Sequence, residues 1–488
     1  MSTEHVDVLI VGAGLSGIAA AYHLQHKCPG KRFAILEGRG AIGGTWDLFR
    51  YPGIRSDSDM YTLGYNFKPW TEKQVIADGD RIRNYIKEVA RDGGFQQKIR
   101  FGHKVVNAAW SSETATWTLD IQKKSGETVQ LTCNWLMMCS GYYNYEEGFT
   151  PEFKGRDNFK GQVIHPQFWP ENFDYSGKRV VVIGSGATAI TLIPSMTDKA
   201  QHVTMLQRTP TFMSADSPIH PLETQLRALD LPADWIHEIM RRAFIAKVDG
   251  EVEISFAHPE EMRAALIEQA RALLPEGFDV EKHFNPSYRP WQQRIAIIPD
   301  GDLFAAISSG KASVVTDRIE RLDATGIQLT SGEHLDADIV VTATGFNMKM
   351  FGGVPFFVDG EAVDFTQRVS YRGLMMEGIP NMAYVAGYIR SSWTLRADLV
   401  SDLVCRICEH MEKQGYNVVV PKVPAADADM QRLPWIDTEN VNSGYFMRSL
   451  HLLPKQGDRH PWKHGLEYAE ERVSFPAVQP DEEALTYR

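Results

Sequence analysis

Residues 6–17 read Val-Asp-Val-Leu-Ile-Val-Gly-Ala-Gly-Leu-Ser-Gly, a short apolar run that leads directly into a glycine-rich turn. The residues from Ile18 onward predict a helix, and the apolar run at 33–37 predicts a second buried strand. A strand, a Gly-x-Gly-x-x-Gly turn, a helix and a strand ending in an acid form the dinucleotide-binding pattern. The sequence therefore predicts a nucleotide site close to its N-terminus.

Each glycine of this pattern has its own structural role. Gly12 makes the tight turn, Gly14 lets the backbone approach a pyrophosphate, and Gly17 lets the helix pack closely on the strand. Glu37 ends the second strand, where a carboxylate can hold the ribose hydroxyls of an adenosine. Because an acid there disfavours a 2′-phosphate, the expected ligand is FAD or NAD.

A second glycine turn of the same type stands far downstream. The apolar strand at 179–183 precedes Gly184-Ser185-Gly186-Ala187-Thr188-Ala189, and a helix containing Pro194 leads to a strand at 203–207. The acid is replaced here by Arg208-Thr209, which suits the 2′-phosphate of NADP. A solvated surface arginine is the alternative interpretation of Arg208.

Two such units predict an α/β fold with two Rossmann-like dinucleotide-binding domains. A long run of helix formers between the second unit and its last strands predicts a helical insertion. The expected divisions are the N-terminal part of the first domain at 1–145, a linker at 146–175, the second domain at 176–350 with its insertion near 220–280, and a return to the first domain with a C-terminal tail at 351–488.

Alternating segments at 98–110, 116–119 and 128–132 predict a small antiparallel sheet inserted in the first domain. The chain then returns through a buried parallel strand that begins at Trp135 and ends at Gly141. That glycine either approaches a cofactor or makes a plain strand-to-loop turn.

Composition limits the partners. A net charge of −11 gives no support for a nucleic-acid surface, so small molecules are expected. Five cysteines fit a reducing compartment, and the N-terminus shows no secretory signal, so cytoplasm is the expected location. No run reaches the roughly 20 apolar residues of a membrane span. Cys405 and Cys408 are interpreted as buried neutral thiols, and no metal site is expected.

The long loop after the first unit contains Gly43-Gly44-Thr45-Trp46 and then Arg-Tyr-Pro-Gly-Ile-Arg-Ser-Asp at 50–57. A loop of this length beside a nucleotide turn is usually functional. Trp46 either stacks on a ring system or belongs to the core, and Tyr51 is equally ambiguous. Asp57 could cap a turn instead of taking part in chemistry.

Residues 159–170 read Phe-Lys-Gly-Gln-Val-Ile-His-Pro-Gln-Phe-Trp-Pro. Gly161 permits an unusual backbone angle, and Phe159 and Trp169 are large apolar anchors on either side. The proline after His165 favours an extended conformation at the histidine. Taken alone, this histidine is more often a satisfied structural group than a catalyst.

These stretches resemble type I Baeyer-Villiger monooxygenases. The family's FxGxxxHxxxWP fingerprint is matched by Phe159, Gly161, His165, Trp169 and Pro170. Its GxWxxxxYPGxxxD pattern is matched by Gly44, Trp46, Tyr51, Pro52, Gly53 and Asp57. The stretches at 50–70, 391–396 and 453–462 are most similar to the ethionamide-activating monooxygenase subgroup.

The resemblance implies that FAD binds the first site and NADPH the second, and that NADPH reduces the flavin. With O2, the enzyme would insert one oxygen atom next to a ketone carbonyl, and oxidation of thioethers or thioamides at sulfur or nitrogen is the alternative. The expected FAD contacts are Gly12, Gly14, Ser16, Gly17, Glu37, Gly44, Thr45, Trp46, Asp57 and Val105. The expected NADPH contacts are Arg55, Gly184, Ser185, Gly186, Ala187, Thr188, Ala189, Arg208 and Thr209.

The resemblance also implies that Arg294 is catalytic, because a fixed positive charge stabilises an anion in a dry site. Asp57 would orient this guanidinium, and His165 would couple cofactor position to domain movement without transferring oxygen. Two other classes share part of the pattern. A flavoprotein disulfide reductase needs a dithiol facing the flavin, and a non-catalytic NADPH sensor would consume no oxygen.

Overall fold

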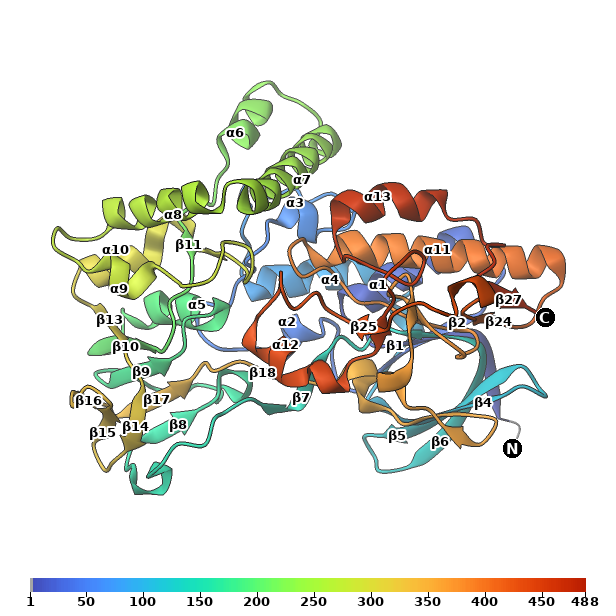
Figure 1. Cartoon of the computed structure of the whole chain (residues 1–488), viewed down its shortest axis with the longest axis horizontal. Coiled ribbons are helices and arrows are strands. Elements are labelled where there is room, and N and C mark those ends of the chain that lie inside the picture. Colours follow the sequence, from blue (N-terminus) through green and yellow to red (C-terminus); the bar gives the residue numbers. More distant parts are fainter. Residues whose placement is uncertain (1–2) are drawn as a thin grey trace.

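The computed structural model describes residues 3–488 and contains two α/β lobes side by side (Figure 1). The first lobe holds the N-terminal segment and the C-terminal third of the chain, and the second lobe holds the middle. Each lobe is built on its own mainly parallel or mixed sheet with a separate hydrophobic core. The predicted α/β class with two Rossmann-like domains is confirmed.

The first lobe contains a nine-stranded sheet in the order β20-β19-β4-β5-β6-β1-β2-β3, with β23 also paired to β6. The strands are β1 (Glu4–Val11), β2 (Phe33–Glu37), β3 (Ile99–Phe101), β4 (His103–Ser111), β5 (Thr116–Lys123), β6 (Thr128–Met138), β19 (Phe356–Val358), β20 (Glu361–Ala362) and β23 (Met382–Tyr384). Strand β6 pairs antiparallel with β5 and parallel with β1. The expected inserted sheet is therefore continuous with the parallel sheet, because one eleven-residue strand belongs to both.

Helices cover this sheet, and α1 (Leu15–Lys27) packs along α11 (Trp393–Gln414). Both helices bury apolar side chains in one core, which explains why α11 belongs to the first lobe although it lies late in the chain. The remaining helices near the N-terminus are α2 (Thr45–Leu48), α3 (Met60–Leu63) and α4 (Gly79–Asp92). The five cysteines are free and buried, as interpreted for Cys405 and Cys408.

The second lobe contains a five-stranded parallel sheet in the order β13-β10-β9-β17-β8. Its elements are β8 (Gln162–Ile164), β9 (Arg179–Ile183), α5 (Ala187–Met196), β10 (His202–Gln207), α10 (Asp302–Ser308), β13 (Ala312–Thr316) and β17 (Ile339–Thr342). The central strands are almost wholly apolar because helices and a small sheet cover both faces.

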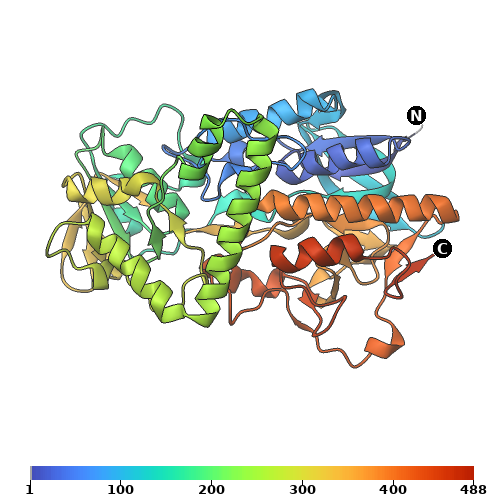
Figure 2. The same cartoon turned by 90° about the horizontal axis from the view of Figure 1, so that it is seen from above.

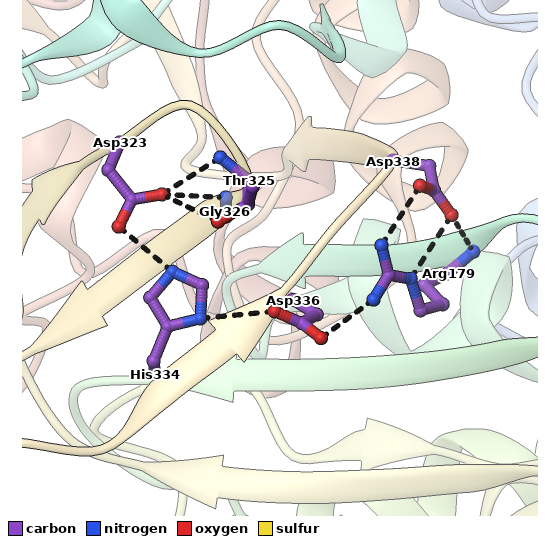
Figure 3. A network of polar contacts seen from close by, with 7 residues as sticks. All are labelled: Arg179, Asp323, Thr325, Gly326, His334, Asp336 and Asp338. Carbon is purple, nitrogen blue, oxygen red and sulfur yellow. Dashed lines mark hydrogen bonds and ion pairs between the residues drawn. The ribbon is translucent and has the colours of Figure 1, made fainter.

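A three-stranded meander of β14 (Ile319–Leu322), β15 (Gly326–Leu329) and β16 (His334–Asp336) is tied to this sheet by a polar network (Figure 3). Arg179, the first residue of β9, binds Asp336 at 2.7 Å and Asp338 at 3.1 Å. His334 lies between two carboxylates, with Nε2 at 2.9 Å from Asp323 and Nδ1 at 3.2 Å from Asp336. The network lies on the outer side of the second lobe.

The chain crosses between the lobes through an antiparallel ribbon. Strand β7 (Tyr143–Gly148) leaves the first lobe and pairs with β18 (Phe346–Met348), which returns to it. Figure 1 shows this ribbon between the two lobes. Because the outgoing and returning segments are hydrogen-bonded to one another, they form one joint instead of two independent linkers.

The predicted helical insertion consists of α6 (Pro221–Ala228), α7 (Ala233–Ala257), α8 (Pro259–Leu273) and α9 (Val280–Phe284), flanked by β11 (Met213–Ser214) and β12 (Ala296–Ile297). Helix α7 crosses the join between the lobes (Figure 2). Its residues Met240 and Phe244 pack into the core of the first lobe, whereas Ile267 of α8 packs into the core of the second. The insertion therefore connects the lobes as well as covering them.

The C-terminal segment contains β21 (Ser370–Tyr371), β22 (Met375–Met376), β24 (Val419–Pro421), β25 (Leu433–Pro434), α12 (Gly444–Ser449), β26 (Lys455–Gln456), α13 (Tyr468–Ala477) and β27 (Leu485–Tyr487). It returns to the first lobe, where the fully buried Arg396 of α11 binds Glu471 of α13 at 2.8 Å. Within residues 3–488, none of the helices has the length and apolar character needed to cross a membrane.

The contact between α7 and the first lobe should make the folding stability of the protein sensitive to acid. The backbone N–H of Trp70 donates to Nδ1 of His237 at 3.0 Å, and burial lowers the pKa of His237 to about 4. In the unfolded chain the histidine has an ordinary pKa near ~6.5, so the unfolded state binds the proton first. Stability is therefore complete above pH ~6.5 and falls as the pH drops toward 4.

We predict that His237→Gln, whose amide oxygen can still accept from Trp70, reduces this acid-induced loss by on the order of 2 kcal/mol. Chemical denaturation between pH 7 and pH 4 measures it. The exposed His451→Gln is the control and should leave the pH dependence unchanged. If the free energy of unfolding falls equally with pH in His237→Gln and in the unmodified protein, His237 is not the cause of the acid sensitivity.

Candidate active site

A cavity of about 820 Å³ lies between the two lobes, at the carboxyl ends of both parallel sheets. Both glycine turns reach it, as do the loop at 43–58, Arg294 and the C-terminal segment near Ser443. Open α/β sheets bind ligands at this edge. The cavity is therefore the place where two nucleotide cofactors and a substrate can meet.

The first glycine turn has the geometry that its pattern predicts. Gly12 has φ of +111°, and a Cβ there would lie 2.4 Å from the carbonyl oxygen of Cys139. A Cβ on Gly17 would lie 1.9 Å from the Gly12 carbonyl oxygen, so a side chain is excluded where helix and strand pack. The turn thus leaves its backbone open to the cavity, as a bound pyrophosphate requires.

Glu37 faces the same cavity at the end of β2. Its carboxylate accepts hydrogen bonds from the backbone N–H groups of Ala13 at 2.9 Å and Arg39 at 2.8 Å. Burial raises the pKa of Glu37, and these two hydrogen bonds oppose the rise. Val105 of β4 lies on the same wall, so both residues are placed for the adenosine end of a dinucleotide.

Three other predicted FAD contacts also line the cavity. Trp393 donates from Nε1 to the Ser16 hydroxyl at 2.7 Å, which places this serine beside the start of α11. The Thr45 hydroxyl lies 3.4 Å from the Tyr145 hydroxyl. Trp46 packs against the first core and also lines the cavity, and its stacking on a ring system stays a prediction.

Gly53 has a role that the sequence did not reveal. It has φ of +75°, and a Cβ there would lie 1.8 Å from the Ser195 hydroxyl and 2.5 Å from the Thr191 carbonyl oxygen of α5. The neighbouring Tyr51 is buried in the core of the second lobe. The Tyr-Pro-Gly stretch of the first lobe therefore packs directly on a helix of the second.

The second glycine turn repeats the first. Gly184 has φ of +128°, and a Cβ would lie 2.3 Å from the Ala343 carbonyl oxygen. Of the predicted NADPH contacts, those that line the cavity are Arg55, Gly186, Ala187 and Thr188. Gly184, Ser185, Ala189, Arg208 and Thr209 lie outside its lining. Arg208 is exposed directly after β10, and its contact with a 2′-phosphate stays a prediction.

Arg55 also joins the lobes. Its guanidinium forms a two-point ion pair with Asp302 at the start of α10, including a 3.2 Å hydrogen bond from Nη2 to Oδ1. The arginine comes from the first lobe and the aspartate from the second. A cationic side chain at the cavity wall is thus held in place before any anionic ligand arrives.

The structure brings Arg294 and Asp57 together, as the family resemblance implied. Arg294 Nε lies 2.7 Å from Asp57 Oδ2, and Nη2 donates to the Ser58 hydroxyl at 2.6 Å. Nη1 donates to the Ile389 carbonyl at 3.2 Å. Arg294 and Asp57 both line the cavity, so a fixed cation faces the space between the nucleotide sites.

Sequence reasoning missed three tyrosines that stand around this ion pair. Tyr142 and Tyr143 follow the strand-to-glycine return at Gly141, and Tyr445 comes from α12. All three line the cavity, and burial raises the pKa of each. The phenols are therefore neutral hydrogen-bond donors. The run after Gly141 was a usable signal, whereas nothing in the sequence marks Tyr445.

His165 directly follows β8 of the second lobe, lies beside the ribbon between the lobes, and does not line the cavity. Its Nδ1 accepts from the backbone N–H of Gln167 at 3.2 Å, and Nε2 donates to the Gly345 carbonyl at 3.1 Å. Burial lowers the pKa of His165. A Cβ on Gly148 would lie 2.2 Å from the imidazole ring. A part in domain coupling stays a prediction.

The other fingerprint residues are structural. Phe159 belongs to a core cluster beneath the meander, and a Cβ on Gly161 would lie 2.3 Å from the Asp338 carbonyl oxygen. Trp169 packs edge-on against Phe173 at 5.7 Å between ring centroids. Together they attach the segment that carries His165 to the second lobe.

These features define a flavoprotein class with two dinucleotide sites. Cys405 and Cys408 lie in α11 and do not line the cavity, so this site has no dithiol of the kind that a disulfide reductase uses. The open glycine turns, the carboxylate at Glu37 and the cavity volume fit FAD and NADPH.

Comparison with known proteins identifies the family. A flavin-binding monooxygenase-like model matches residues 69–223, and an NAD(P)-binding Rossmann-like domain model matches residues 10–70. The FAD-containing monooxygenase EthA of Mycolicibacterium smegmatis is 49% identical over 486 residues, covering 99% of this chain and 97% of the relative. The probable FAD-binding monooxygenase AlmA of Acinetobacter baylyi is 45% identical over 487 residues, covering 99% and 96%.

Solved structures share the whole fold. An oxidised steroid monooxygenase bound to NADP superposes with a TM-score of 0.78 at 22% identity, covering 99% of both chains. An open crystal structure of cyclohexanone monooxygenase gives a TM-score of 0.76 at 20% identity, covering 100% of both chains. At these identities the likeness concerns the fold.

The chain belongs to the FAD-containing monooxygenases of the flavin-binding monooxygenase-like family. It is an NADPH-dependent flavoprotein monooxygenase, and its cofactors are FAD and NADPH. The family predicted from the motifs is confirmed. This membership argues against the disulfide reductase and the non-catalytic sensor.

The contact of Gly53 with α5 can be tested by substitution. We predict that Gly53→Ala lowers the free energy of unfolding by more than about 1 kcal/mol, because it adds a collision with α5 to the strain of a positive φ. Gly177→Ala is the matched control, since Gly177 has φ of +67° with no atom within 4 Å of a Cβ. Equal losses in denaturant unfolding would mean that the close packing has no energetic effect.

Proposed function

We propose that this enzyme is a Baeyer-Villiger monooxygenase, which inserts one oxygen atom from O2 next to a ketone carbonyl to give an ester or lactone. The observation that carries the proposal is the Arg294–Asp57 ion pair, which faces the cavity where both nucleotide sites meet. The structures of similar fold include a cyclohexanone monooxygenase, which supports a ketone as substrate.

When bound, NADPH supplies the hydride and FAD supplies the oxygen-activating chemistry. The residues of the chain bind and orient these groups. The first turn through Gly12 and Gly14, and the second turn through Gly186, would offer open backbone to the two pyrophosphates, and Glu37 would offer a carboxylate to a ribose. Thr45 and Trp46 line the same cavity as the Arg294 guanidinium.

Arg294 would stabilise negative charge that develops on oxygen during the transfer. An arginine guanidinium keeps its charge near neutral pH, and here its direction is fixed by Asp57, Ser58 and the Ile389 carbonyl. A donor fixed before the reaction costs no reorganisation when the charge appears. Removing one such group typically lowers turnover by on the order of 100-fold to 1,000-fold.

We predict that Arg294→Ala still oxidises NADPH under anaerobic conditions, seen as loss of flavin absorbance, but that ester formation falls by roughly 100-fold to 1,000-fold. Rapid-mixing absorbance and product analysis with a ketone measure the two steps separately. Arg432→Ala, an exposed arginine that does not line the cavity, is the control. Ester formation at an unchanged rate would remove Arg294 from the mechanism.

Oxidation of thioethers or thioamides at sulfur or nitrogen is the second candidate. The observation that favours it is the set of buried phenols, Tyr142, Tyr143 and Tyr445, on the same cavity wall as Arg294. Neutral O–H donors can supply a proton to an oxygen that is being transferred to an electron-rich sulfur. The two reactions would therefore use different residues of the same site. Ketone oxidation would depend on the positive charge of Arg294, and sulfur oxidation would depend on a proton donated by a tyrosine.

We predict that Tyr445→Phe lowers the ratio of sulfoxide to ester when a ketone and a sulfide compete, because a proton donor is lost while Arg294 is kept. NADPH oxidation across a panel of linear, cyclic and aryl ketones and of sulfides, with product identification, measures this ratio. Phe446→Leu, a change in the neighbouring core residue of α12, is the control. A ratio that does not change would exclude Tyr445 as the donor.

A further inference from the structure

The loop that carries Arg294 contains an unusual backbone conformation. Trp291, three positions before the catalytic arginine, has φ of +62° and is buried. A bulky residue in the left-handed region is strained, and such conformations persist only where the surrounding structure holds them. The groups that hold Trp291 therefore also fix the backbone from which Arg294 projects.

Arg390 is the side chain placed to do this. It is buried, and its Nε donates to the Trp291 carbonyl at 3.1 Å. Its Nη2 donates to the Asn440 carbonyl at 2.6 Å, and its Nη1 forms an ion pair with Glu467. One guanidinium thus connects the Arg294 loop to two separate parts of the C-terminal segment.

The same C-terminal segment also forms direct hydrogen bonds with the loop. Gln292 donates from Nε2 to the Glu439 carbonyl at 2.7 Å, and its own carbonyl accepts from the Asn442 N–H at 3.1 Å. Arg289 donates to the Asn440 side chain at 3.2 Å. These contacts surround Trp291 on both sides in the sequence, so the strained residue is held from outside its own loop.

Arg390 is also the immediate neighbour of Ile389, whose carbonyl accepts from Arg294 Nη1 at 3.2 Å. One segment therefore fixes Arg294 twice: through Ile389 at the guanidinium and through Arg390 at the loop backbone. Arg390 itself does not line the cavity, whereas Ile389 does. Arg390 is thus a positioning residue and does not touch the substrate.

We propose that Arg390 holds the Arg294 loop in its strained conformation and so sets how much of the consumed NADPH is converted into oxygenated product. The proposal rests on the function proposed for Arg294. Loss of the Trp291 contact would let the loop relax, so that Arg294 no longer points into the cavity in a fixed direction. Flavin reduction should be kept, because the polar partners of the Arg390 guanidinium are Trp291, Asn440 and Glu467, which all lie outside the glycine turns.

The experiment compares Arg390→Met and Arg390→Lys in the full-length enzyme loaded with FAD. Lysine keeps the positive charge opposite Glu467 but has no donor at the Nε position. It therefore cannot donate hydrogen bonds to the carbonyls of Trp291 and Asn440 at the same time. Both variants are expected to reduce flavin at a rate within about twofold of the unmodified enzyme, while product formed per NADPH falls by roughly tenfold or more. Arg372→Met is the matched control, because Arg372 also ties the C-terminal segment through a partly buried ion pair, with Glu482 at 3.0 Å, away from the loop.

Hydrogen exchange of the backbone amides at 289–294 gives a second readout that needs no turnover. It should increase in both Arg390 variants and stay unchanged in Arg372→Met. Unchanged loop exchange and unchanged coupling in an FAD-loaded Arg390 variant would overturn the proposal. If Arg390→Lys restores both readouts, the ion pair with Glu467 and not the Trp291 contact is what matters, which also overturns it. If the unmodified enzyme oxidises NADPH but forms no ester, the proposed function fails, and the loop exchange still decides the role of Arg390.

Discussion

The ion pair between Arg294 and Asp57 joins a loop of the first lobe to the loop before β12 in the second, and the active-site cavity depends on the packing that brings these two residues together. They are 237 positions apart in the chain, so no local preference can make them meet. The distance of 2.7 Å depends on how the two nucleotide-binding lobes are oriented, which in turn sets the shape of the cavity between the glycine turns. A change in that orientation would alter cofactor geometry and catalytic geometry at the same time.

Ion pairs alone cannot maintain this orientation. A partly exposed pair contributes about 0 to 1 kcal/mol, whereas burying one large apolar side chain contributes about 1.5 to 3 kcal/mol. Helix α7 buries Met240 and Phe244 in the core of the first lobe although its neighbour α8 packs into the second. Apolar packing of the insertion therefore supplies most of the free energy that holds the two lobes in this orientation. The ion pairs of Arg294 and Arg55 fix the directions of the two guanidinium groups. The two segments that cross between the lobes, β7 and β18, are also hydrogen-bonded to one another.

Much of this architecture could be predicted from the sequence because it is encoded locally. A glycine at a positive φ, a strand of valines and isoleucines, or an acid at a strand end leaves a signal within a few residues, as at Gly12, Gly184 and Glu37. The family resemblance also named Arg294 and Asp57 correctly as neighbours. Local patterns were less informative where one segment contacts two parts of the fold. Strand β6 was expected as two separate strands, although it is continuous. The residues around Gly53 did not indicate that this glycine packs on α5.

The sequence by itself determined two nucleotide-binding units, their order and the family, and through the family resemblance it named Arg294 and Asp57 as partners. Only the tertiary structure decided that Tyr445 enters the cavity, that Arg208 stands outside its lining and that Arg390 holds the strained backbone at Trp291. These facts depend on contacts between segments up to hundreds of residues apart, and such contacts leave no periodicity or spacing in the chain. Turns and strands follow from neighbouring residues, whereas the composition of an interlobe cavity follows from how complete lobes pack.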